Sequence, residues 1–206
     1  MKLITVGVAL LLLTVPASAA ATCEAERVRR DLAVMSDAVA DKQASPTPAD
    51  APTTVVIIRH ADRDDARDAL SKPGLNRAAR VWEIFEDNPP ALVFHTSRHR
   101  SKQTARPAAT RYKVPMVQYP YVPGDEPAAA AFARVILSNC AGNTLLVAGH
   151  SDTIVPLVSA FAKERVEPVN DAYDRVYRIT ISASGSATLL VTTYGNSHSS
   201  AQRVAQ

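Results

Sequence analysis

The stretch Thr53-Thr54-Val55-Val56-Ile57-Ile58-Arg59-His60-Ala61-Asp62 decides the expected fold. Four β-branched apolar residues in a row are typical of a strand that is buried on both faces, as strands of a parallel sheet are. The run ends abruptly at an arginine and a histidine. We therefore predict a central buried strand whose carboxyl end carries Arg59 and His60.

Two other apolar runs end in the same way. Residues 91–94 lead into His95-Thr96-Ser97-Arg98-His99-Arg100, and residues 144–148 lead into Gly149-His150-Ser151-Asp152-Thr153. In an open α/β sheet, ligands bind outside the carboxyl ends of the strands. If the three runs are parallel neighbours, Arg59, His60, Arg100 and His150 converge on one pocket. Two arginines and two imidazoles in one cleft suit an anionic, phosphorylated ligand.

The composition is that of one globular domain. The chain has 206 residues, 47% of them hydrophobic, which is enough to build a core. The formal charge of +3 is small, and the basic residues are scattered rather than clustered. This pattern argues against a nucleic-acid partner. The sequence also lacks a His, Cys and carboxylate spacing typical of a metal site, so we expect no metal and no other cofactor.

Residues 1–21 have the pattern of a signal peptide. Lys2 supplies the positive end, residues 3–15 are apolar, and a small-x-small pattern favours cleavage after Ala19, with Ala21 as the alternative. The apolar part, roughly 13 residues, is short for a membrane span of about 20. We therefore expect a periplasmic or secreted protein without stable membrane insertion after the signal is removed. Thr22 before Cys23 argues against a lipoprotein.

Export changes the interpretation of the two cysteines. In an oxidising compartment, an even number of cysteines suggests a disulfide. Cys23 and Cys140 are therefore either a disulfide or two free thiols, and the sequence leaves both alternatives open.

Between Cys23 and the central strand we expect a helix over residues 24–42 with one apolar stripe, and then a linker over residues 43–52.

The rest of the chain alternates between helix and strand patterns. The fold expected from it is a three-layer α/β sandwich with a mostly parallel central sheet, helices on both faces and a C-terminal β-hairpin. One helix is expected to begin near Leu75 and to bury Leu75, Ala78, Ala79, Trp82 and Phe85. The other expected elements are a strand over 92–95, a helix over 101–111, a proline-rich loop to 127, a helix over 128–137, a strand over 145–148, a helix over 153–163 and hairpin strands over 175–182 and 187–193.

Several motifs occur here in an order that resembles the histidine phosphatase superfamily, also called phosphoglycerate-mutase-like, in its small bacterial branch. The resemblance covers residues 54–195, nearly the whole mature chain. The matching segments are Arg59-His60-Ala61 (for Arg-His-Gly), Ser71-Lys72-Pro73-Gly74-Leu75, Arg100-Ser101-Lys102-Gln103-Thr104-Ala105, Gly149-His150-Ser151-Asp152-Thr153 and Tyr173-Asp174-Arg175.

The resemblance implies a role for each residue of the expected pocket. His60 would be the nucleophile that takes the phosphoryl group onto an imidazole nitrogen. Arg59 and Arg100 would bind the phosphoryl oxygens, and His150 would add a further contact. Together with the patterns described above, it divides the chain into the signal peptide (1–21), the N-terminal helix and linker (22–52) and a histidine phosphatase domain (53–206).

The family usually supplies a carboxylate that protonates the leaving group, from the loop after the second strand. Asp125 and Glu126 lie in that region and are equally plausible as helix-start residues. Asp152 stands two residues after His150, which does not match the register of phytase-like relatives. Ala61 replaces a glycine, and Ala66 stands where an asparagine is common.

The sequence predicts an exported, metal-independent phosphatase that hydrolyses a small phosphomonoester through a phosphohistidine on His60. The alternatives are a non-catalytic phospholigand-binding envelope protein and a phosphomutase. Sugar phosphates, lipopolysaccharide core phosphates, phosphorylated lipids and phosphopeptides all fit such a pocket.

Overall fold

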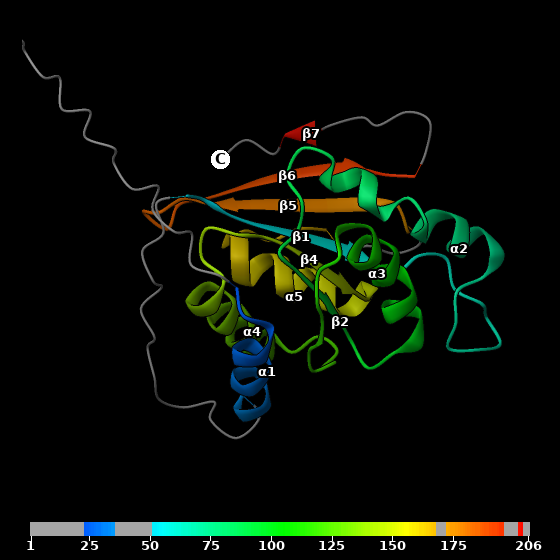
Figure 1. Ribbon diagram of the computed structural model, residues 1–206, viewed down its shortest axis with the longest axis horizontal. Coiled ribbons are helices and arrows are strands. Elements are labelled where there is room, and N and C mark those ends of the chain that lie inside the picture. Colours follow the sequence, from blue (N-terminus) through cyan, green and yellow to red (C-terminus); the bar gives the residue numbers. More distant parts are fainter. Residues whose placement is uncertain (1–22, 36–50, 168–171, 196–201, 204–206) are drawn as a thin grey trace, which may run out of the picture.

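A computed structural model describes residues 23–35, 51–167, 172–195 and 202–203. The predicted signal peptide (1–21) lies outside these residues, as do most of the predicted linker and the end of the predicted N-terminal helix. The described strands form one sheet in the order β3-β2-β4-β1-β5-β6-β7 (Figure 1).

The parallel half of the sheet contains the three runs that the sequence singled out. They are β1 (Thr53–Arg59), β2 (Leu92–His95) and β4 (Thr144–Gly149), and β4 lies between the other two. Arg59 pairs with Gly149, and His95 pairs with Ala148, so all three strands end at the same edge. The prediction that they are parallel neighbours is confirmed. The sequence missed β3 (Met116–Gln118), because a three-residue edge strand next to prolines leaves little alternation to detect.

The antiparallel half adds β5 (Arg175–Ile181), β6 (Ala187–Thr193) and the short β7 (Gln202–Arg203). Gly185 has a φ of 82° in the turn between β5 and β6, a conformation that glycine adopts without a steric cost. The predicted C-terminal hairpin is confirmed.

Helices cover both faces of the sheet, which confirms the three-layer prediction (Figure 1). On one face, α1 (Ala25–Val34), α4 (Glu126–Asn139) and α5 (Ser151–Ala162) pack over side chains such as Val55 and Ile57. On the other, α3 (His99–Tyr112) and the 3₁₀ helix η1 (Val81–Phe85) pack over Val56 and Ile58. Successive strand residues point to opposite faces, so two covered faces require the unbroken apolar run of β1.

The helix expected from Leu75 to Phe85 is instead two short pieces, α2 (Lys72–Ala78) and η1. Ser71 caps α2 by accepting a hydrogen bond from the Gly74 N–H, so the helix begins earlier than predicted and is rotated. Gly74 and Ala78 face inward, Leu75 is 50% exposed, and Ala79 is exposed too. The predicted burial of Leu75 and Ala79 was therefore wrong.

A disulfide joins Cys23 to Cys140, which decides between the two alternatives that the sequence left open. It ties the start of α1 to the C-terminal end of α4, and Val28 and Leu32 of α1 are buried against the same core.

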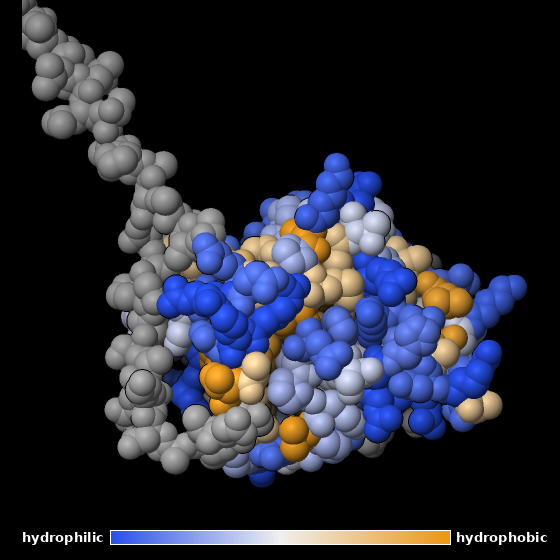
Figure 2. Space-filling model, turned by 60° about the horizontal axis from the view of Figure 1, so that its bottom comes forward, coloured by the Kyte–Doolittle hydropathy of each residue, from blue (hydrophilic) through white to orange (hydrophobic). Residues whose placement is uncertain are grey.

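No helix in the described part of the chain is long and apolar enough to cross a membrane. On the face drawn in Figure 2 the surface is mostly hydrophilic, with apolar residues in small separate patches.

Candidate active site

Two imidazole rings lie side by side at the carboxyl edge of the parallel strands. His60 directly follows β1, and its backbone N–H donates to the carbonyl of Gly149 at 2.9 Å. His150 directly follows β4 and is the N-cap of α5. Because β1 and β4 are in register, the ring centroids are 5.1 Å apart. Both residues are buried.

His60 has one ring nitrogen engaged by its own backbone. Its Nδ1 lies 2.8 Å from the carbonyl oxygen of Ala61. A carbonyl only accepts hydrogen bonds, so we assign the proton of the neutral ring to Nδ1, which leaves a lone pair on Nε2. Burial lowers the pKa of His60 to about 4, and the positive charges of Arg100 and Arg59 act in the same direction, against the hydrogen bond to Ala61. At neutral pH this ring is uncharged.

His150 is held in the opposite tautomer. The Nη2 of Arg100 lies 3.3 Å from its Nδ1, and the Oγ1 of Thr96 lies 2.8 Å from its Nε2. A guanidinium only donates, so Nδ1 is the acceptor and the Nε2–H donates to Thr96. Burial lowers the pKa of His150 to about 3, and the charges of His60, Arg100 and Arg98 add to this effect. Both imidazoles are therefore neutral, and the cations of the site are its arginines.

The two predicted arginines lie near the imidazole pair. Arg59, the last residue of β1, is buried, and its guanidinium carbon lies 4.1 Å from the centroid of the Tyr173 ring. That ring is in turn 5.8 Å from the ring of His60. Arg100, in the first turn of α3, donates from Nη1 to Asp68 at 2.7 Å. The structure thus brings together all four predicted residues, Arg59, His60, Arg100 and His150.

A tyrosine and an aspartate form the rim on the His150 side. The ring of Tyr121 lies 4.4 Å from the ring of His150, and its hydroxyl donates to Asp152 at 2.8 Å. The guanidinium of Arg98 lies 5.4 Å from the same tyrosine ring. Tyr121, in the loop between β3 and α4, therefore lies against the site, as expected for loops at the carboxyl ends of strands.

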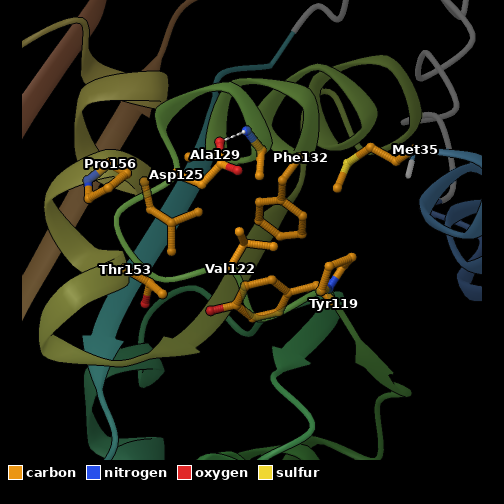
Figure 3. Close-up of a pocket in the computed structure, with 11 residues that line it drawn as sticks. Met35, Tyr119, Val122, Asp125, Ala129, Phe132, Thr153 and Pro156 are labelled. Atoms are coloured by element: carbon orange, nitrogen blue, oxygen red, sulfur yellow. Dashed lines mark hydrogen bonds between the residues drawn. The ribbon is translucent and has the colours of Figure 1, made fainter. Parts of the chain in front are cut away.

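The two predicted candidates for the proton donor have other partners. Asp125 caps α4 by accepting from the Ala128 N–H at 2.9 Å (Figure 3), and Glu126 pairs with Arg165 at the surface. Asp125 also lines a largely apolar pocket of about 300 Å³, open mouth included, together with side chains such as Tyr119, Phe132 and Thr153 (Figure 3). Both carboxylates thus have the role of helix-start residues that the sequence left as the alternative.

Among the described residues, no three His, Cys, Asp or Glu side chains gather as a metal ion would require.

The fold resembles several solved structures, although the sequences have diverged widely. The tungstate complex of the protein histidine phosphatase SixA is 20% identical over 66% of this chain and 93% of its own, with a TM-score of 0.53. A mycobacterial glucosyl-3-phosphoglycerate phosphatase is 14% identical over 66% of this chain and 96% of its own (TM-score 0.51). Phosphoglycerate mutase from Plasmodium falciparum is 14% identical over 68% and 89% (TM-score 0.51). The chain has the histidine phosphatase fold. No family model and no curated protein sequence matches it.

Three residues that contribute to the site were not predicted from the sequence. They are Thr96, which accepts from the Nε2–H of His150, Asp68, which binds Arg100, and Tyr121, whose ring lies against His150. Tyr173 was noted only as part of a motif, without a place in the site. A threonine directly after β2 is the one signal among them, because it occupies the same strand-end position as His60 and His150.

Proposed function

We propose that this protein is a phosphatase that hydrolyses a small phosphomonoester through a phosphohistidine on His60. The observation that carries the proposal is the neutral His60 ring, with its Nε2 lone pair available, next to the Arg59 and Arg100 guanidinium groups. Phosphoryl transfer needs a positioned nucleophile and cations for the equatorial oxygens, and this site supplies both. The solved SixA structure contains tungstate, an oxyanion, and supports an anion site in this fold.

In the first step, the Nε2 lone pair of His60 attacks phosphorus and the bond from phosphorus to the ester oxygen breaks. The leaving oxygen takes up a proton from water, and the hydrogen bond from Nδ1 to the Ala61 carbonyl stabilises the ring as it becomes positive. In the second step, a water oxygen attacks the phosphohistidine, the N–P bond breaks, and inorganic phosphate and neutral His60 are released. Arg59 and Arg100 hold the phosphoryl oxygens in both steps.

The proposal also includes the setting of the reaction. We propose export to the periplasm or the exterior, on the strength of the signal-peptide pattern in residues 1–21. The Cys23–Cys140 disulfide supports this, because disulfides persist in oxidising compartments. We further propose that hydrolysis needs no metal, since arginine side chains provide the positive charge.

The test is hydrolysis of an aryl phosphate by the mature protein in EDTA, beside the His60→Ala variant. We expect metal-independent turnover that falls at least about a thousandfold in the variant, as for other lost nucleophiles. His99→Ala, which removes an exposed imidazole from the start of α3, is the matched control and should keep its activity. Turnover that survives in His60→Ala would refute the mechanism.

Two outcomes would favour the alternatives. Binding of inorganic phosphate without turnover of any phosphomonoester would favour the non-catalytic binding protein. Transfer of the phosphoryl group to a second hydroxyl of the substrate, rather than to water, would favour a mutase, and one of the structures that share the fold is a phosphoglycerate mutase.

A further inference from the structure

Asp68 contacts the proposed active site from a loop that follows the nucleophile in sequence. Its Oδ1 accepts from the Arg100 Nη1 at 2.7 Å, and its Oδ2 accepts from the backbone N–H of His99 at 3.0 Å. Both oxygens of the carboxylate are therefore anchored to the first turn of α3. The Arg100 side chain is 17% exposed and that of Asp68 is 40% exposed, so the pair is partly shielded from solvent.

The contact with Asp68 leaves one edge of the Arg100 guanidinium for another partner. In this planar group, Nε and Nη2 form one edge, and Asp68 binds only Nη1. Nη2 is directed toward His150, at a distance of 3.3 Å that makes a weak hydrogen bond. The Nε is buried and has no hydrogen-bond partner among the described residues. A buried donor without a partner is costly, so this edge is arranged to meet an acceptor.

We propose that Asp68 is a positioning residue, which fixes Arg100 so that its Nε–Nη2 edge binds two equatorial oxygens of the phosphoryl group. This inference rests on the proposed phosphatase function. Bidentate binding needs the guanidinium plane in one orientation, and a free arginine side chain has many. Asp68 removes that freedom before the substrate arrives, and its own charge stays on the far side of Arg100 from the phosphate.

Asp68 is a poor candidate for the proton donor to the leaving group. Each of its oxygens already accepts a hydrogen bond from a nitrogen, and neither contact accommodates a proton on the carboxylate. Partial burial alone would raise the pKa of Asp68, but the hydrogen bonds from His99 and Arg100 outweigh burial and hold the pKa below its usual range. Asp68 therefore acts through Arg100 as an anion.

The experiment compares Asp68→Ala and Asp68→Asn with the matched control Asp64→Ala. Asp64 lies in the same loop but pairs with the exposed Arg67. The measurements are the inhibition constant of inorganic phosphate and kcat/KM for an aryl phosphate and an alkyl phosphate. We expect Asp68→Ala to weaken phosphate inhibition and lower kcat/KM roughly ten- to a hundredfold, the range for a lost hydrogen bond to a charged group. Asp68→Asn, which keeps an acceptor oxygen, should lose less, and Asp64→Ala should change neither value by more than about twofold.

Two further comparisons separate positioning from other roles. The loss in kcat/KM should be the same for the aryl and the alkyl ester, whereas a missing proton donor would impair mainly the alkyl ester, whose leaving group is poorer. In an Arg100→Ala background, Asp68→Ala should have no further effect, because the residue that it positions is gone.

The proposal is wrong if Asp68→Ala behaves like Asp64→Ala, if the loss is confined to the alkyl ester, or if the two substitutions are additive. Thermal unfolding of each variant at the assay pH shows whether the variant is folded under the assay conditions. A lower kcat/KM of a folded variant is then a property of its site and not of its stability. If the wild type proves inactive, the phosphatase proposal fails by itself. Direct calorimetry of inorganic phosphate with wild type and Asp68→Ala then still decides whether Asp68 orders the anion site.

Discussion

Removing the Cys23–Cys140 disulfide should destabilise the protein severely without changing its chemistry. The variant is Cys23→Ala with Cys140→Ala, because Cys140 is fully buried and a serine there would bury a hydroxyl. Cys23 precedes α1, and Cys140 follows α4 near the start of β4. His150 follows the other end of β4, roughly 20 Å from the start of that strand at about 3.3 Å per residue, so the site should keep its geometry.

The expected loss follows from the length of the closed loop. The two cysteines are 117 residues apart in sequence. For a loop of this length, the loss of conformational entropy in the unfolded chain amounts to about 5 kcal/mol at 25 °C. The side chains of Val28 and Leu32 remain available to pack in the variant, so their burial does not add to the loss. At a urea dependence of about 2 kcal/mol per molar, the unfolding midpoint should fall by about 2.5 M.

The assay is equilibrium unfolding in urea, followed by circular dichroism, for the oxidised protein, the reduced protein and the double variant. The reduced protein is the matched control, since it keeps both side chains and lacks only the bond. We expect both to have the lower midpoint, with kcat/KM for an aryl phosphate within about twofold of the wild type in the absence of urea. A loss of less than about 1 kcal/mol in both would refute the loop-closure argument.

Three other perturbations test the site and its supports. The folded-state pKa values of His60 (about 4) and His150 (about 3) lie below the usual 6.5, so below pH 6.5 the unfolded chain binds protons that the folded chain does not. The free energy of unfolding should therefore fall from pH 6.5 to pH 4, by up to about 1.4 kcal/mol per pH unit for each histidine, and His60→Gln should reduce the slope measured in urea. Thr96→Val removes the acceptor of both the His150 Nε2–H and the Arg98 N–H, and should cost about 1–3 kcal/mol in urea unfolding, whereas an unchanged midpoint would contradict a stabilising role for these two hydrogen bonds. Gly74→Ala would place a Cβ 2.0 Å from the Asp62 carbonyl oxygen, so α2 must shift. We expect the free energy of unfolding to fall by about 1–3 kcal/mol, seen as a lower melting temperature.

The strands were predictable because their physical cause is local. A run such as Val55–Ile58 is apolar at every position, and only a sheet covered on both faces buries all of it. The helix starts were less predictable, because one capping contact decides them. The hydrogen bond from the Gly74 N–H to Ser71 starts α2 three residues before Leu75 and turns that leucine to the solvent.

The residues of the site also differ in how far the sequence predicts them. Arg59 ends β1, and His60 and His150 directly follow β1 and β4, so the end of an apolar run marks all three in the sequence. Asp68 has no such mark, because its contact with Arg100 spans 32 residues and depends on the path of the loop. The disulfide could be suspected but not decided, since the sequence does not show whether two cysteines lie within bonding distance.

The predictable part of the site also explains its chemistry. The apolar run that places β1 in the middle of the sheet ends at His60, so the ring inherits a buried position at the strand end. Burial is the largest cause of its low pKa, and the nearby arginines lower it further. An imidazole with an ordinary pKa of 6.5 would be partly protonated near neutral pH and a poorer nucleophile. The arginines that would bind the phosphoryl oxygens thus also help to keep the His60 lone pair free, and the Asp68 carboxylate holds one of those arginines in place.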